Sequence, residues 1–157
     1  PYTTLFRSHC EDCSAHHFAE TVYQTHQVII LPPVEFIKEF PDEDVTIHID
    51  RMRLTQVITN FLGNAKKFTS QGHIKLGYFC DKEKKEIHFF VEDTGAGIPK
   101  EELQMIFERF YKRNEFVQGV GLGLAISKVI VEKMNGHIDV QSEVNKGSRF
   151  TAVLPYL

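Results

Sequence analysis

The sequence has few cysteines, a small net charge and no long apolar segment. Three cysteines among 157 residues are too few, and odd in number, for a disulfide framework, and they favour a reducing, cytoplasmic environment. The net charge of −3 gives no general affinity for nucleic acid or for anionic membranes. No apolar run is long enough to cross a bilayer, and no signal peptide opens the chain. We therefore expect no nucleic-acid partner and no membrane contact.

The remaining composition is that of an ordinary globular domain, with 42% hydrophobic and 25% charged residues. The length suits one domain with a real core. Residues 1–8 (PYTTLFRS) differ from the rest and resemble translated adapter DNA, so we assign the domain to residues 9–157. On this interpretation the natural protein begins upstream of His9, and the chain is a fragment.

The N-terminal segment 9–25 combines possible metal ligands with a helical pattern. Cys10, Cys13, His16 and His17 have a spacing that invites a zinc site. Structural zinc sites usually draw on two separated ligand pairs, however, and no second pair follows closely. We interpret the segment as a helix with cysteine facing the core.

Further along the chain, hydrophobic periodicity and turn residues divide the sequence into short elements. The predicted elements are strands at 28–31, 34–40 and 44–50, a helix at 51–69, a hairpin of 72–80 with 86–92, helices at 100–107 and 125–134, and a closing hairpin of 137–143 with 148–154.

The helix predicted at 51–69 carries a polar stripe beside its apolar face. At 100° per residue, Asn60, Asn64 and Lys67 fall within about 60° of one another. Asparagine is a poor helix former, so two on one stripe suggest a use. An amide oxygen can coordinate Mg²⁺, and a lysine can neutralise phosphate charge. A solvated polar edge explains the stripe equally well.

Two glycine-rich segments also carry possible ligand contacts. In D-T-G-A-G, Asp93 follows the strand predicted at 86–92, and Gly95 and Gly97 permit a sharp turn that a flat ligand could approach. An ionised carboxylate accepts hydrogen bonds, which suits an exocyclic amine such as adenine N6. The second segment, 119–124 (GVGLGL), precedes a helix, where backbone N–H groups bind anions.

The segment between these two glycine motifs is predicted to act as a lid. Residues 114–118 have no clear periodicity and are followed by Gly119. Phe107 and Phe110 would anchor this lid, although both could equally be plain core residues.

Together these motifs resemble the ATP-binding catalytic domain of sensor histidine kinases, with the Bergerat nucleotide fold. Residues 60–69 are similar to that family's N box, 93–98 to its G1 box, 107–112 to its F box and 119–124 to its G2 box. Residues 147–150 resemble its last glycine motif. The resemblance covers about residues 10–157, with the motifs in the family's order.

The resemblance implies an α+β two-layer fold, with a mixed five-stranded sheet and helices packed on one face. It implies ATP and Mg²⁺ as ligands, with Asn64 binding the metal, Asp93 the adenine amine, and Phe68 lining the adenine pocket. The ATP-binding residues that it implies are Asn60, Asn64, Lys67, Phe68, Asp93, Gly95, Gly97, Ile98, Phe107, Lys112, Gly119, Val120, Gly121, Leu122, Gly123, Leu124 and Ser148.

The sequence departs from the family pattern in two places. Val120 stands where a Thr or Ser is frequent, which removes a hydroxyl near the phosphates. No H-E/D-x-R/K-x-P phosphoacceptor segment occurs, so the chain itself supplies no catalytic histidine. The implied partners are a dimerisation/phosphoacceptor domain, expected upstream in the parent kinase, and a response-regulator receiver domain. The isolated chain is expected to be monomeric.

Two other functions compete with a kinase domain. ATPases related to gyrase and Hsp90 carry a glutamate base just before the first N-box asparagine, where this chain has Thr59. A non-catalytic nucleotide-binding module is the other alternative, and intact Asp93, Asn64 and glycine pairs favour nucleotide binding over full degeneration.

Overall fold

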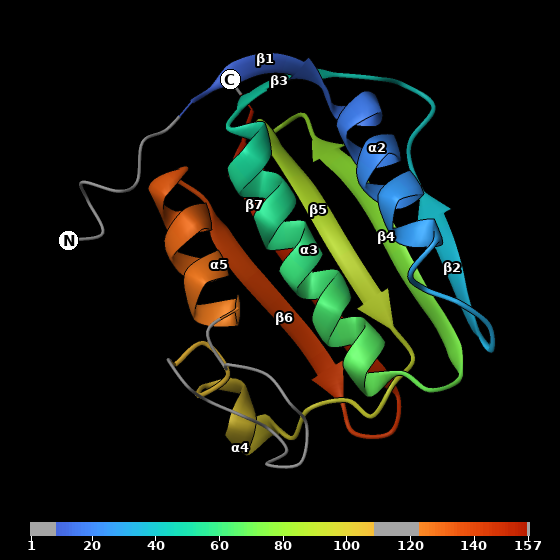
Figure 1. The fold of residues 1–157 in the computed structure, drawn as a ribbon. Coiled ribbons are helices and arrows are strands. Elements are labelled where there is room, and N and C mark those ends of the chain that lie inside the picture. Colours follow the sequence, from blue (N-terminus) through green and yellow to red (C-terminus); the bar gives the residue numbers. More distant parts are fainter. Residues whose placement is uncertain (1–8, 109–122, 157) are drawn as a thin grey trace.

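A computed structural model describes residues 9–108 and 123–156, which form two sheets and a layer of helices (Figure 1). The elements are β1 (Glu11–Ser14), α2 (Ala15–Gln27), β2 (Val34–Glu39), β3 (Thr46–Ile49), α3 (Arg51–Phe68), β4 (Gly72–Asp81), β5 (Glu86–Asp93), α4 (Lys100–Leu103), α5 (Gly123–Lys133), β6 (His137–Glu143) and β7 (Gly147–Pro155).

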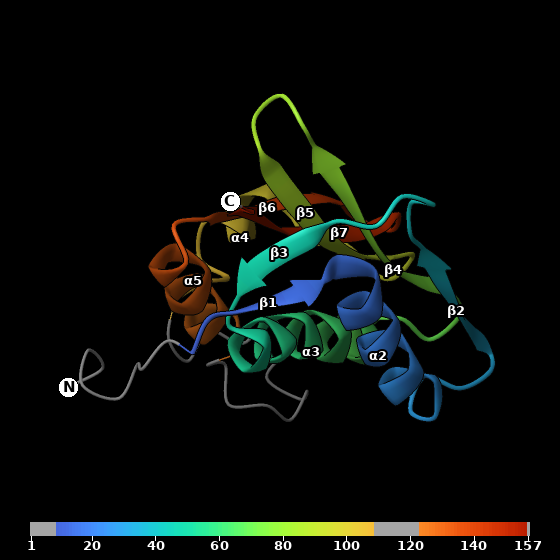
Figure 2. The same cartoon turned by 90° about the horizontal axis from the view of Figure 1, so that it is seen from above.

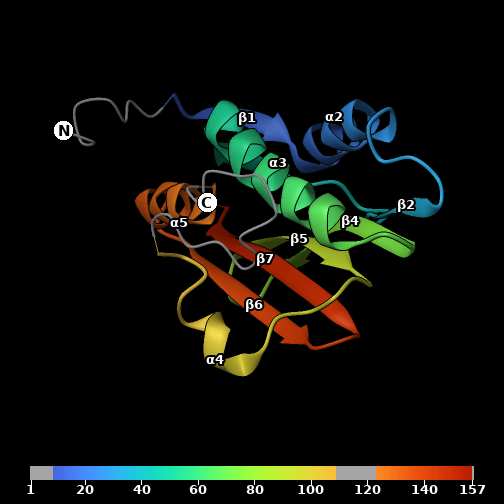
Figure 3. The same cartoon turned by 60° about the horizontal axis from the view of Figure 1, so that its bottom comes forward.

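The main sheet has five strands in the order β2-β4-β5-β7-β6. β2 runs parallel to β4, and the other neighbours are antiparallel, so the sheet is mixed. Helices α2, α3 and α5 lie on one face of it (Figure 2 and Figure 3). The predicted fold class and both predicted hairpins are therefore confirmed. The small antiparallel sheet of β1 and β3 was not predicted.

Helix α3 supplies more buried apolar residues to the core than α2 or α5 does. It begins where the sequence predicts, because the Asp50 side chain caps it by accepting a hydrogen bond from the Arg53 N–H at 3.2 Å. Its apolar stripe is buried against the sheet. The buried residues of this stripe are Leu54, Val57, Ile58, Phe61, Leu62 and Ala65.

Two expectations for the N-terminal region were wrong. Residues 9–25 do not form one helix: Cys13 lies on β1 opposite Ile47, and the helix starts only after Ser14, whose side chain caps it. Residues 28–31 form a turn and no strand, with the N–H groups of Ile29 and Ile30 both donating to the His26 carbonyl. An apolar run by itself did not distinguish an exposed turn from a strand.

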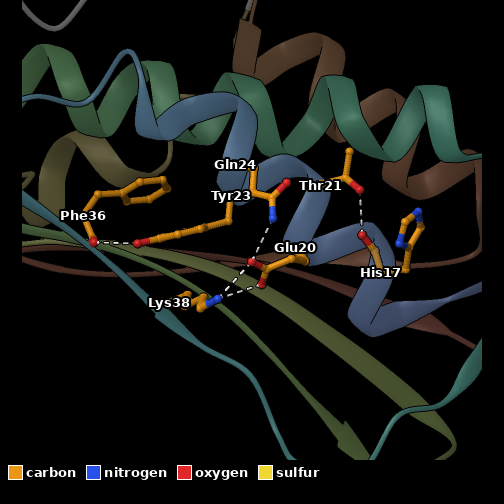
Figure 4. A network of polar contacts seen from close by, with 7 residues as sticks. All are labelled: His17, Glu20, Thr21, Tyr23, Gln24, Phe36 and Lys38. Atoms are coloured by element: carbon orange, nitrogen blue, oxygen red, sulfur yellow. Dashed lines mark hydrogen bonds and ion pairs between the residues drawn. The ribbon is translucent and has the colours of Figure 1, made fainter.

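Helix α2 is held against the edge strand β2 by a polar network (Figure 4). The Lys38 ammonium donates to both carboxylate oxygens of Glu20 at 2.9 Å, and this bond lowers the pKa of Glu20. The Tyr23 hydroxyl donates to the Phe36 carbonyl at 3.0 Å, while the two rings stack at 4.5 Å. The partly exposed ion pair adds little stability, so the stacking of Tyr23 on Phe36 contributes more to the packing of α2 against β2.

Two helices differ in length from the prediction. Helix α4 ends at Leu103 and not at 107, because turns follow it, with the Met105 N–H donating to the Glu102 carbonyl. Helix α5 begins at Gly123 and ends at Lys133, after which Asn135 adopts a left-handed conformation with φ 64°. No described helix is long and apolar enough to span a membrane.

Candidate functional site

Asp93 lies at the end of the central strand β5, beneath the C-terminal end of α3 (Figure 1). Its side chain is only 7% exposed, and one carboxylate oxygen accepts a hydrogen bond from the Gly95 N–H at 2.9 Å. Across the sheet its partner is Ser148 of β7. A buried carboxylate thus faces the helical layer at one end of the molecule.

Burial raises the pKa of the Asp93 carboxyl, and nearby hydrogen-bond donors oppose this rise only in part. The donors are the backbone N–H groups of Gly95 and Ser148 and the Thr69 hydroxyl. The Thr69 hydroxyl is itself buried and has no well-formed hydrogen bond within the described chain. A ligand that donates hydrogen bonds here would relieve both groups.

Gly95 and Gly97 pack against other parts of the chain. A Cβ on Gly95 would lie 2.3 Å from the Phe68 carbonyl oxygen, at the end of α3. Gly97 has φ +72°, and a Cβ there would lie 2.0 Å from the carbonyl oxygen of Glu143. The Ala96 N–H also donates a hydrogen bond to the Phe68 carbonyl at 3.2 Å, which attaches the loop of residues 95–98 to the end of α3. The structure gives these glycines a packing role, and their contact with a ligand stays a prediction.

The closing hairpin of β6 and β7 also contacts the loop of residues 95–98. The Ile98 N–H donates to the Ser142 hydroxyl oxygen at 2.7 Å, and that hydroxyl donates to the Gly147 carbonyl at 3.0 Å. The Ser142 and Ser148 hydroxyl oxygens lie 2.8 Å apart. Ile98 and Ser148, both predicted site residues, are therefore joined to Asp93 in one network.

The polar stripe of α3 leads away from Asp93. Phe68, next to the Gly95 loop, and Asn64 are partly buried, whereas Lys67 is exposed. Asn60 is eight residues from Phe68, which corresponds to about 12 Å along the helix axis. The stripe therefore connects the end of β5 with the start of α5.

Asn60 joins α3 to α5. Its side-chain N–H₂ donates to the Gly123 carbonyl and to the Ser127 hydroxyl, both at 3.0 Å. Because a carbonyl can only accept, the Asn60 amide nitrogen, and not its oxygen, must make the contact with Gly123. The predicted stripe residue is thus also a structural link to the helix that follows the second glycine motif.

Several predicted site residues come from the part of the chain between α4 and the first turn of α5. Phe107 is partly buried against the core, and its contact with ATP stays a prediction. Gly123 and Leu124 form the first turn of α5. Lys112, Gly119, Val120, Gly121 and Leu122 lie outside the described residues, as do Phe110 and the predicted lid.

The described side chains offer amide oxygens for a divalent cation. Asn64 and Asn60 each carry a side-chain amide oxygen, and the two hydrogen bonds from the Asn60 side chain to α5 use its nitrogen and not its oxygen. No cluster of three or more histidine, cysteine or carboxylate side chains that could hold a metal occurs among the described residues. This donor set fits Mg²⁺, which commonly binds one or two protein oxygens and completes its shell with water and phosphate.

Three residues of the site were missed from sequence. Thr69 and Ser142 surround the Asp93 region, and Ser127, fully buried on α5, accepts from Asn60. The signal available for Ser142 was its place in β6, where alternation puts it on the inward face with Ile138 and Val140. A polar residue at an apolar position of a strand is a usable clue.

Comparison with known proteins gives consistent results. Residues 49–157 match the family described as histidine kinase-, DNA gyrase B-, and HSP90-like ATPase. The chain is 38% identical over 128 residues to the sensor histidine kinase WalK of Bacillus subtilis, covering 78% of this chain and 21% of WalK. It is 44% identical over 110 residues to the sensor protein SrrB of Staphylococcus aureus, covering 68% of this chain and 19% of SrrB. It therefore spans about a fifth of these relatives.

Solved structures agree with the fold. Full-length ShkA in complex with AMPPNP superposes with a TM-score of 0.88 at 28% identity, covering 96% of this chain and 32% of ShkA. The nucleotide-free catalytic domain of the histidine kinase ThkA gives 0.83 at 28% identity, covering 94% of this chain and 96% of that domain. The chain therefore belongs to the histidine kinase-, DNA gyrase B- and HSP90-like ATPase family, as an ATP-binding catalytic domain of the sensor histidine kinase type.

Proposed function

We propose that this domain binds Mg·ATP and presents the γ-phosphate to a histidine of a separate dimerisation/phosphoacceptor domain. The observation that carries the proposal is the buried Asp93 carboxylate at one end of a stripe whose other end, at Asn60, adjoins α5. This arrangement separates a base-recognition end from a phosphate end along one helix. The ShkA structure, which contains the ATP analogue AMPPNP, supports the assignment by its similarity.

Adenine is proposed to bind at the Asp93 end. The ionised carboxylate accepts from the exocyclic amine of adenine, whereas guanine offers a carbonyl at that position and would be repelled. Phe68 lines the base, and the packed Gly95–Ile98 loop keeps the carboxylate in place. An amine that donates to Asp93 also favours the ionised form, against the rise that burial causes in its pKa.

The phosphates are proposed to extend toward Asn64 and Asn60. The Asn64 amide oxygen would hold Mg²⁺, while Asn60 and the Lys67 ammonium would help to hold the phosphates. When bound, Mg²⁺ neutralises phosphate charge and helps to align the γ-phosphate. Predicted backbone donors of residues 119–122 would complete the phosphate site.

The acceptor histidine is proposed to come from another domain, with a response-regulator receiver as the next partner. Phosphoryl transfer depends mainly on positioning and charge stabilisation, so a domain that only holds ATP can serve it. The residue before Asn60 is Thr59, which cannot act as a carboxylate base toward water. This favours transfer to another group over the hydrolysis typical of the ATPase alternative.

The test mixes the chain with ATP labelled on the γ-phosphate, with and without the phosphoacceptor domain of the parent kinase as a separate polypeptide. We expect acid-labile label on that domain's histidine, none on this chain, and slow release of free phosphate. Rapid phosphate release by the chain alone would support the ATPase alternative and reject the proposal.

A further inference from the structure

Three strands place a row of hydroxyl and carboxyl groups on the helical face of the sheet. Asp93 of β5 lies opposite Ser148 of β7, and Ser148 lies opposite Ser142 of β6. Residues directly opposite one another in a sheet point to the same face. The row therefore ends at the proposed base-recognition carboxylate and begins at Ser142, a residue with no role in the function proposed above.

The hydrogens in this row have only one consistent arrangement. A serine hydroxyl has one hydrogen and two lone pairs. The Ile98 N–H can only donate to Ser142, and the Gly147 carbonyl can only accept from it, which commits the Ser142 hydrogen to Gly147. The hydrogen in the 2.8 Å contact between the two serines must then come from Ser148.

This arrangement determines whether the Ser148 hydroxyl donates or accepts a hydrogen bond with a ligand. Its only hydrogen is used toward Ser142, so its remaining lone pairs can act only as acceptors. Asp93 beside it is also an acceptor when ionised. The row therefore presents acceptors to a ligand, directly or through a bridging water. That pattern is complementary to an amine and not to a carbonyl.

We propose that Ser142 is a specificity-determining positioning residue, which directs the Ser148 hydroxyl hydrogen away from the base and so makes the site select adenine over 6-oxopurines. Ser142 acts through Ser148 and touches no nucleotide itself. The inference rests on the proposed function, because it assumes that the base lies at Asp93. It adds a second determinant of selectivity to the carboxylate.

The experiment compares ADP with IDP, whose bases differ at the six position, where adenine has an amine and hypoxanthine a carbonyl. Calorimetric titration of the full chain with each nucleotide in Mg²⁺ gives the ratio of the two Kd values. In Ser142→Ala the Ser148 hydrogen is freed and can donate to the carbonyl of IDP. We expect the preference for ADP to fall by about 3- to 10-fold, the effect of one hydrogen bond.

Further variants separate positioning from general damage to the loop. Ser142→Thr keeps the hydroxyl and should restore the wild-type ratio. Gln141→Ala, an exposed neighbour on the other face of β6, should change neither affinity nor ratio. In a Ser148→Ala background, Ser142→Ala should leave the ratio unchanged, because the group through which Ser142 acts is gone.

The outcomes decide between the two proposals. Equal weakening of ADP and IDP by Ser142→Ala, with an unchanged ratio, would overturn the specificity role and leave only loop packing. If that variant does not fold, Ser142→Cys takes its place, since a thiol is a weak acceptor and should also lower the ratio. A wild-type chain that binds neither nucleotide would reject the proposed function itself.

Discussion

Replacing Gly95 with alanine separates two explanations for the glycine after Asp93. If the glycine serves only the approach of a ligand, the variant loses nucleotide binding and keeps its stability. If it serves packing, the free protein itself is destabilised. The structure favours packing, because the new Cβ would lie 2.3 Å from the Phe68 carbonyl oxygen and 2.7 Å from the Thr69 hydroxyl.

The expected cost follows from this overlap. Ordinary contacts begin near 3.4 Å, so the loop or the end of α3 must move by about 1 Å. Overpacking of this kind costs about 1–3 kcal/mol. For a domain of this size each kcal/mol lowers the melting temperature by about 2–4 °C. Thermal unfolding without nucleotide, followed by circular dichroism, measures the effect.

Gly63 provides a matched control within the same protein. It lies inside α3, where an added Cβ would meet nothing within 4 Å. Because alanine is the better helix former, Gly63→Ala should stabilise the domain by about 0.5–1 kcal/mol. A Gly95→Ala variant as stable as the wild type would refute the packing explanation. The glycine would then be explained by the close approach of a ligand.

Three other changes should have distinct effects. Asn64→Ala should weaken ADP binding strongly with Mg²⁺ and little with EDTA, because the lost group is the proposed metal ligand; an equal loss in both titrations would make it merely structural. For Asp93→Asn, the unfolding free energy relative to the wild type should increase as pH rises from about 4. The wild-type carboxyl has a raised pKa, so the folded state binds more protons than the unfolded state and loses stability in that range, whereas asparagine does not titrate. A difference that does not depend on pH, measured by urea unfolding, would contradict the burial of this charge. Tyr78→Phe should leave the unfolding free energy unchanged or raise it by up to about 1 kcal/mol. Burial raises the pKa of Tyr78 to about 12, and its hydroxyl has no hydrogen-bond partner among the described residues. A fall in unfolding free energy above about 1 kcal/mol in the same assay would mean that the hydroxyl is hydrogen-bonded.

Sequence patterns predicted the elements that have strong periodicity. The apolar spacing of α3 located that helix to within one residue, and alternation located both hairpins. The turn at 28–31 was missed because most of its apolar side chains, such as Val28, are exposed, and a local sequence pattern carries no information on burial. The β1–β3 pair was missed because it joins segments that are distant in sequence.

The residues of the candidate site could be proposed from the sequence, but their contacts could not. Motif order placed Asp93, Asn60 and Asn64 in one site, and the structure brings the first to the end of α3. The sequence alone could not show that the Asn60 amide is hydrogen-bonded to α5, or that Ser142 orders the hydroxyl groups beside Asp93. Such roles depend on atoms from separate elements, which only the fold brings together.

The most direct test of the account is calorimetric titration of the intact chain with Mg·ATP and with Mg·GTP. We predict ATP binding with a Kd between about 1 μM and 1 mM, the range usual for nucleotide substrates, and clearly weaker binding of GTP. The Asp93→Asn variant should lose most of the ATP affinity. Equal affinity for ATP and GTP, or undiminished ATP binding by Asp93→Asn, would contradict recognition of adenine by this carboxylate.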